Sequence, residues 1–181
     1  LKTLNWLRPG THWVLKSPNH CEQLSAIFDV FPDATIIQTH RTPMETMASC
    51  CSLMAHTQGL STDRVDPEAI GQHWLKKVQR MSDRAMAARH DNPNRRVIDV
   101  FYEDLINAPG DVISQIYQHH GSPLTEAGCN AAIAAAKMRN SKSNKRHAYA
   151  LADFGLTAND IEMALGDYIA KYQFQVRSGD I

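Results

Sequence analysis

The feature that most restricts the fold of this chain is a change of pattern, from strand to helix, between residues 34 and 56. Residues 34–39 form a short apolar run that is typical of a buried β-strand. Pro43 favours the first turn of a helix, and a helical pattern continues from it to about residue 56. Apolar runs at residues 13–16 and 96–101 predict two further strands. Strands that alternate with helices predict an α/β fold, in which helices flank a parallel sheet.

Further helices are expected on both sides of the third strand. Asp66 and Pro67 form a helix start, and apolar residues at helical spacing follow as far as about residue 90. Other helical patterns cover residues 109–120, 125–138 and 157–172, and one follows Pro18. The polar stretches 57–65 and 139–148 are expected to be loops.

Composition restricts the class of partner. The 181 residues suffice for one domain, residues 1–181, with a substantial core. Nineteen basic residues balance nineteen acidic ones, which argues against binding to nucleic acid or to an anionic membrane. No apolar run approaches the roughly 20 residues of a membrane span. The oligomeric state is not indicated, and because the chain begins at Leu1 we expect that the natural N-terminus is missing.

The cysteines and histidines show no metal-binding pattern. None of the four cysteines forms a CxxC pair, and the nine histidines lack the HExxH spacing. We therefore expect reduced thiols that pack as small buried hydrophobic side chains, a cytoplasmic protein and no metal ion.

The segment that follows the strand at residues 34–39 has the chemistry of an anion site. Arg41 lies where the strand ends, and its planar guanidinium suits a phosphate. The next helix begins at Pro43 and offers unpaired N–H groups, while Ser49 can add a hydroxyl two turns later. The alternative is a surface arginine with a small serine packed between helices.

The expected topology places further candidates beside this segment. Ligands of parallel α/β sheets bind at the carboxyl ends of the strands. Lys16, Arg41 and Tyr102 all fall at such ends, which predicts one shared site. Residues 10–17 imitate the phosphate loop G-x-x-x-x-G-K-[ST], but Leu15 replaces the second glycine and the segment is predicted to be a strand.

Four segments, in order, resemble the sulfotransferases that use 3′-phosphoadenosine-5′-phosphosulfate (PAPS), and bacterial-type members in particular. In chain order they are WVLKSPNH, THRTPMETMAS, VFYEDL and HAYALADFGL. In the second of these, Ser49 follows Arg41 by eight residues. The likeness spans nearly the whole chain. It implies the C-terminal portion of a sulfotransferase domain, whose three-layer fold is similar to that of the P-loop nucleotide hydrolases.

The resemblance also implies roles for the nucleotide-binding residues. Arg41 and Ser49 would bind the 3′-phosphate of PAPS, and Tyr102 would lie near the adenine. Lys145 and Arg146 belong to a basic loop that would close over the same phosphate. The alternatives are an amphipathic tyrosine at the sheet edge and a solvated run of charge.

Two residues are candidates for the chemistry of sulfonate transfer. Lys16 would stabilise the charge that develops on the leaving phosphate oxygen, or would simply extend into solvent from a strand end. His20 could accept the proton of the acceptor, or could instead contact the following helix or the nucleotide. The expected partners are the nucleotide co-substrate and an unidentified acceptor hydroxyl or amine.

The sequence differs from the pattern of this family in one feature, the loop that binds the 5′-phosphosulfate. A Gly- or Ser-rich loop that cradles the 5′-phosphosulfate in this family would lie before Leu1. The main alternative to an enzyme is therefore a non-catalytic nucleotide-binding fragment or remnant that keeps only the 3′-phosphate half-site. A nucleotide kinase is the weakest candidate, because the chain has no Walker loop.

Overall fold

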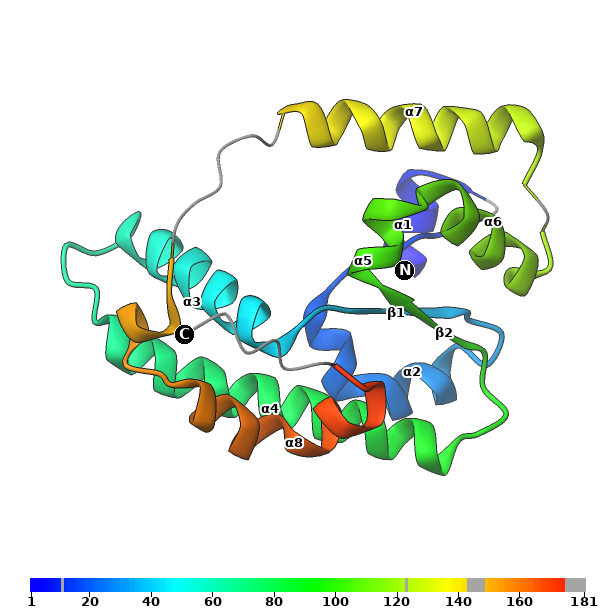
Figure 1. Ribbon diagram of the computed structural model, residues 1–181. Helices are drawn as coiled ribbons and strands as arrows, with labels where there is room; N and C mark the ends of the chain where they lie inside the picture. The colour runs from blue at the N-terminus through cyan, green and yellow to red at the C-terminus, as the bar shows by residue number, and fades with distance from the viewer. Residues whose placement is uncertain (11, 123, 143–148, 175–181) are drawn as a thin grey trace.

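The computed structural model describes residues 1–10, 12–122, 124–142 and 149–174 (Figure 1). Lys145 and Arg146 lie outside these ranges. In chain order the elements are α1 (Lys2–Leu7), η1 (Pro18–Gln23), α2 (Leu24–Val30), β1 (Ile36–His40), α3 (Pro43–Gly59), α4 (Pro67–Asp91), β2 (Val97–Phe101), α5 (Tyr102–Asn107), α6 (Pro109–His120), α7 (Glu126–Lys142), η2 (Leu151–Phe154) and α8 (Ala158–Tyr172), where η denotes a 3-10 helix.

The sheet of the described residues consists of β1 and β2, which run parallel as the sequence predicts. Their register pairs Ile36 with Val97 at one end and His40 with Phe101 at the other. The two strands therefore end side by side, and the residues that follow them, Arg41 and Tyr102, leave the sheet together.

The prediction of a third strand at residues 13–16 is wrong. These residues form no strand, and Val14 is 92% exposed. An apolar run forms a strand only where it can hydrogen-bond to another strand and pack against an apolar surface. Neither β1 nor β2 pairs with this segment. The indole N–H of Trp13 instead donates a hydrogen bond to Asn5 Oδ1, at 3.3 Å.

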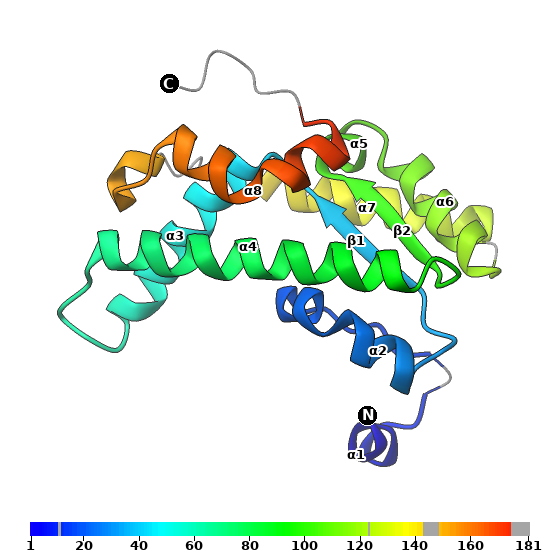
Figure 2. The same cartoon turned by 90° about the horizontal axis from the view of Figure 1, so that it is seen from below.

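Helices cover the sheet on both faces, which confirms the α/β fold class. Helices α2, α4 and α8 lie on one side, and α5 and α6 lie on the other, with α7 beyond α6 (Figures 1 and 2). The helices predicted from the sequence are present, although α3 continues to Gly59 and α7 continues to Lys142. Helices α1 and α5 and the 3-10 helix η2 were not expected.

Helix α4 is the longest element and packs against five of the others. The Asp66 side chain accepts a hydrogen bond from the Ala69 amide at 3.0 Å, so the predicted N-cap is confirmed. The helix packs against η1, α2, α3, η2 and α8. Helix α4 thus connects η1 and α2 with α3, η2 and α8.

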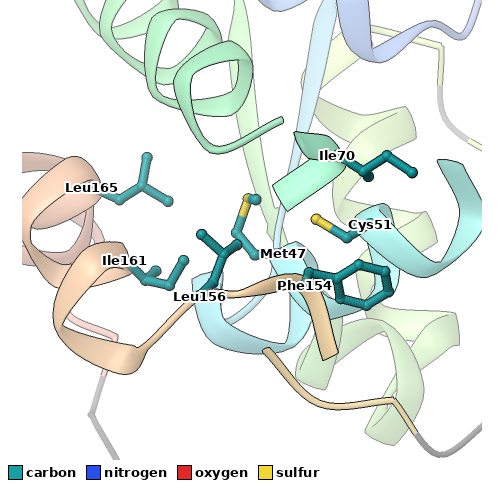
Figure 3. Close-up of a cluster of buried hydrophobic side chains, with 7 residues drawn as sticks. All are labelled: Met47, Cys51, Ile70, Phe154, Leu156, Ile161 and Leu165. Atoms are coloured by element: carbon teal, nitrogen blue, oxygen red, sulfur yellow. The ribbon is translucent and has the colours of Figure 1, made fainter. Parts of the chain in front are cut away.

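Two buried clusters lie along α4. The larger one joins α3, α4, η2 and α8 (Figure 3), and its residues are Met47, Cys51, Ile70, Phe154, Leu156, Ile161 and Leu165. The smaller one joins α2 to α4 beneath the sheet, and its residues are Leu24, Phe28, Ala85 and Ala88. The start of α3, through Met44 and Met47, and the beginning of β1, through Ile36, are therefore anchored on packed apolar surfaces. No helix in the described ranges has the length and apolar character that a transmembrane span requires.

Candidate functional site at the carboxyl end of the sheet

Arg41 and Tyr102 meet where β1 and β2 end. The Arg41 guanidinium carbon lies 4.6 Å from the centre of the Tyr102 ring, within the range of a cation–π contact. The parallel register produces this contact, because each residue directly follows the last residue of its strand. Both side chains remain partly exposed, so a ligand can reach them.

Arg41 keeps hydrogen-bonding capacity for a ligand. Its Nε donates to Glu45 Oε2 at 2.9 Å, one helical turn into α3. The terminal NH₂ groups of the guanidinium make no hydrogen bond with the described residues, and a planar pair of such groups matches two oxygens of a phosphate.

The first turn of α3 adds backbone donors. Thr42, at the N-cap, makes no side-chain cap hydrogen bond, and Pro43 has no N–H. The amides of Met44 and Glu45 precede the first intrahelical hydrogen bond, so they can donate to an anion. Ser49 lies four residues after Glu45, and therefore on the same helix face, with its side chain half-buried.

A buried polar network that was not predicted from the sequence includes His40, the residue directly before Arg41. His40, the last residue of β1, is 1% exposed. Its Nδ1 lies 2.7 Å from the Tyr168 hydroxyl, and its Nε2 lies 2.7 Å from Asp99 Oδ1. Because an ionised carboxylate only accepts, Nε2 carries the proton and Nδ1 accepts from Tyr168. Burial lowers the pKa of His40, and the neighbouring Asp99 carboxylate only partly opposes this effect.

Arg89 of α4 extends the network. Its guanidinium donates to both oxygens of Asp99, at 2.6 and 2.7 Å, and also to Gln38 Oε1 at 2.9 Å and to the Tyr172 hydroxyl at 2.7 Å. Burial alone would raise the pKa of Asp99, but the hydrogen bonds from Arg89 and His40 outweigh burial and lower it. The network therefore joins β1, β2, α4 and α8 through one ionised carboxylate.

The sequence does contain a signal for this network. Gln38, His40 and Asp99 are polar residues inside two strands that begin with apolar pairs, and Gln38 and His40 are two residues apart, on one face. A buried polar side chain requires partners, so this pattern predicts a network. The partners themselves could not be identified from the sequence, because Arg89 and Tyr168 lie far along the chain.

The two predicted catalytic residues come from the segment that leads into α2. Lys16 lies on the exposed segment before η1, and His20 lies within η1. Glu22 fixes η1 to α4 through ion pairs with Lys77 and Arg80. Within the described residues, no hydrogen bond or ion pair joins Lys16 or His20 to Arg41 or Tyr102.

Cavities, cysteines and metal ligands give no competing site among the described residues. One cavity of about 220 Å³ lies between α4 and α8, and another of about 280 Å³ lies between α2 and α4. Neither is lined by a predicted site residue.

The four cysteines are free, and burial raises the pKa of Cys51 to about 11, so it is a packed thiol rather than a nucleophile. No group of three or more metal-ligating side chains occurs in the described ranges.

Comparison with known proteins gives one family. Residues 1–126 match the model of the sulfotransferase family. No significant match to a curated protein was found.

Two solved structures are similar to the chain. The sulfotransferase STF9 from Mycobacterium avium matches with a TM-score of 0.80 and 27% identity over 96% of this chain. The sulfotransferase STF1 from Mycobacterium tuberculosis H37Rv matches with a TM-score of 0.71 and 35% identity over 86% of this chain. The matches cover 45% and 40% of those two proteins, so this chain spans less than half the length of either.

Proposed function

Since this chain belongs to the sulfotransferase family, we propose that it serves the transfer of a sulfonate group from PAPS to a hydroxyl or amine. In this reaction the acceptor attacks sulfur, the bond from sulfur to the phosphate oxygen breaks, and adenosine 3′,5′-bisphosphate leaves. The acceptor loses one proton to a base.

The observation that carries the proposal is the pairing of Arg41 with Tyr102 at the start of α3. The 3′-phosphate would accept hydrogen bonds from the terminal groups of Arg41 and from the first amides of α3, with the Ser49 hydroxyl one further donor on that face. The Tyr102 ring would lie beside the adenosine.

Lys16 and His20 complete the proposal. The Lys16 ammonium would stabilise negative charge on the leaving phosphate oxygen, and His20 would take the acceptor proton. Lys145 and Arg146 would close over the 3′-phosphate. The acceptor is proposed only by its reacting group, a hydroxyl or an amine, and the cytoplasm is the proposed compartment.

Titration calorimetry with adenosine 3′,5′-bisphosphate and with adenosine 5′-monophosphate tests the binding half of this function. The wild-type chain should prefer the bisphosphate. Arg41→Ala should weaken its binding by about 1.5–3 kcal/mol, the scale of a hydrogen bond to a charged group. Glu45→Gln should strengthen it, because Glu45 holds Arg41 Nε and adds a negative charge beside the phosphate.

The control is Arg84→Ala, which removes an exposed arginine of α4 and should leave both affinities unchanged. Equal affinity of the wild-type chain for the two nucleotides would contradict the proposed 3′-phosphate site.

A further inference from the structure

His40 is the last residue of β1 and immediately precedes Arg41, and its side chain is buried whereas that of Arg41 is partly exposed. The His40 ring is buried among hydrogen-bonding and aromatic partners. Both of its nitrogens are hydrogen-bonded, and its centre lies 4.1 Å from the Tyr172 ring and 5.2 Å from the Phe101 ring. A ring packed in this way cannot turn without breaking a buried hydrogen bond.

The same bonds fix β1 against β2. His40 belongs to β1 and Asp99 belongs to β2, so their hydrogen bond joins the two strands through side chains near the carboxyl end. Arg89 strengthens the junction, because it binds Asp99 with two hydrogen bonds and also binds Gln38 of β1. The relative position of the two strand ends decides how Arg41 lies over Tyr102.

Helix α8 closes the network from the other end of the chain. Its Tyr168 donates to His40 and its Tyr172 accepts from Arg89, both at 2.7 Å. Helix α8 is also anchored through Ile161 and Leu165 in the same buried cluster as Met47 of α3. The end of β1 and the start of α3 are thus supported by one helix.

We propose that His40 is a positioning residue, which acts with Asp99, Arg89 and Tyr168 to hold the Arg41 guanidinium against Tyr102 in the geometry that receives the 3′-phosphate. This inference rests on the proposed function for its ligand, but its geometric part does not need a nucleotide. His40 contacts no substrate itself, because its ring is buried and both of its nitrogens are occupied by Tyr168 and Asp99.

The test is a double-mutant cycle on the preference for adenosine 3′,5′-bisphosphate over adenosine 5′-monophosphate, measured by calorimetry. His40→Gln should reduce this preference about tenfold, and Tyr168→Phe should reduce it by a smaller factor because only the Nδ1 hydrogen bond is lost. In the Arg41→Ala background neither change should reduce it further, because the network acts through Arg41. Tyr117→Phe on α6 is the matched control and should have no effect.

A purely structural role predicts a different result. Loss of stability would weaken binding of both nucleotides together, and its effect would persist in the Arg41→Ala background. Either outcome would overturn the proposal, as would an unchanged preference in a folded His40→Gln protein. If His40→Gln fails to fold, the Tyr168→Phe cycle decides, because this substitution keeps the aromatic packing.

A second measurement separates this inference from the proposed function. The ¹H–¹⁵N signal of Arg41 Nε, assigned by its loss in Arg41→Lys, should be ordered in the wild-type protein without nucleotide and displaced by the Tyr102 ring. Tyr168→Phe should move this signal toward that of a mobile arginine. If the wild-type chain shows no nucleotide preference but the signal responds, the proposed function fails and the positioning role stands. A signal that is identical in both proteins overturns the positioning role.

Discussion

Lys16 differs from Arg41 in how its surroundings hold it. Arg41 is fixed by a strand end, by Glu45 and by Tyr102, whereas Lys16 lies in an exposed segment outside the sheet. A lysine with this freedom can follow a charge that develops only during the reaction, but it contributes little to a bound ground state. The proposed function therefore assigns different kinetic effects to these two residues.

We predict that Lys16→Ala lowers kcat for sulfonate transfer about 10²–10³-fold, the usual effect of removing one donor to a developing oxyanion. Affinity for adenosine 3′,5′-bisphosphate should change by no more than about twofold, since the product does not need this contact. Steady-state kinetics and calorimetry measure the two quantities, and Lys76→Ala on the exposed face of α4 is the control. A proportional fall in turnover and affinity would make Lys16 a binding residue.

At the scale of residues, the sequence predicted the positions of those candidate residues that depend on local order. Arg41 and Tyr102 could be placed because each directly follows a strand, and the ends of parallel strands meet at one edge. The partners of His40 could not be placed, because Asp99 and Tyr168 are 59 and 128 residues away. Hydrogen bonds between such distant side chains depend on the packing of α8 against α4, which no local pattern specifies.

Among the elements, α4 and η2 make an unusually close approach. Gly71 of α4 faces the Phe154 carbonyl, and a Cβ built at position 71 would lie 2.1 Å from that oxygen. Only glycine allows the two backbones to come this close. Phe154 belongs to the larger buried cluster, so this contact sets the position of the whole segment that leads into α8.

We predict that Gly71→Ala lowers the free energy of unfolding by about 3 kcal/mol, the upper part of the range for overpacked sites, because a backbone must move. Gly166→Ala in α8 is the matched control. Its Cβ would meet no atom within 4 Å, so the substitution should be neutral or stabilise by up to about 1 kcal/mol. Urea denaturation measures both, and similar effects of the two substitutions would contradict the close approach.

The helices were more predictable than the strands for a physical reason. Helix boundaries are set by local caps, such as Asp66 before α4, Gly121 in the left-handed conformation after α6, and the reciprocal hydrogen bonds of Thr157 and Asp160 at the start of α8. A strand needs a partner from elsewhere in the chain. Residues 13–16 have the composition of a strand but no such partner among the described residues, so the strand predicted from the local pattern does not form.

For the whole molecule, α4 connects the two buried clusters, and the His40 network connects α4 and α8 to the sheet. The apolar packing has no strong dependence on pH, whereas the network does. His40 faces the charges of Asp99 from β2, Arg89 from α4 and Lys171 from α8, together with the hydroxyls of Tyr168 and Tyr172. The protonation of His40 and Asp99 should therefore be visible in global unfolding.

Acidification should destabilise the protein in two steps. Burial lowers the pKa of His40 in the folded chain below its usual value of about 6.5. Between the folded-state pKa and about pH 6.5, the unfolded chain therefore binds a proton at His40 and the folded chain does not. The stabilising contribution of neutral His40 is then present above about pH 6.5 and falls as the pH decreases below that value. The pKa of Asp99 is also lowered, so its contribution is present above about pH 3.9, the usual carboxyl value, and is lost as the pH falls through the folded-state pKa.

We predict that wild-type protein and His40→Gln differ most in free energy of unfolding near pH 7.5, and that the difference shrinks as the pH falls toward 5. The reason is that only the wild-type chain carries the cost of keeping His40 neutral, about 1.4 kcal/mol for each unit by which its pKa is lowered. Urea denaturation at pH 7.5, 6.5, 5.5 and 5.0 measures the difference. A difference that stays constant over this range would mean that His40 is protonated as readily in the folded chain as in the unfolded one, which is incompatible with a neutral ring that accepts from Tyr168 and donates to Asp99.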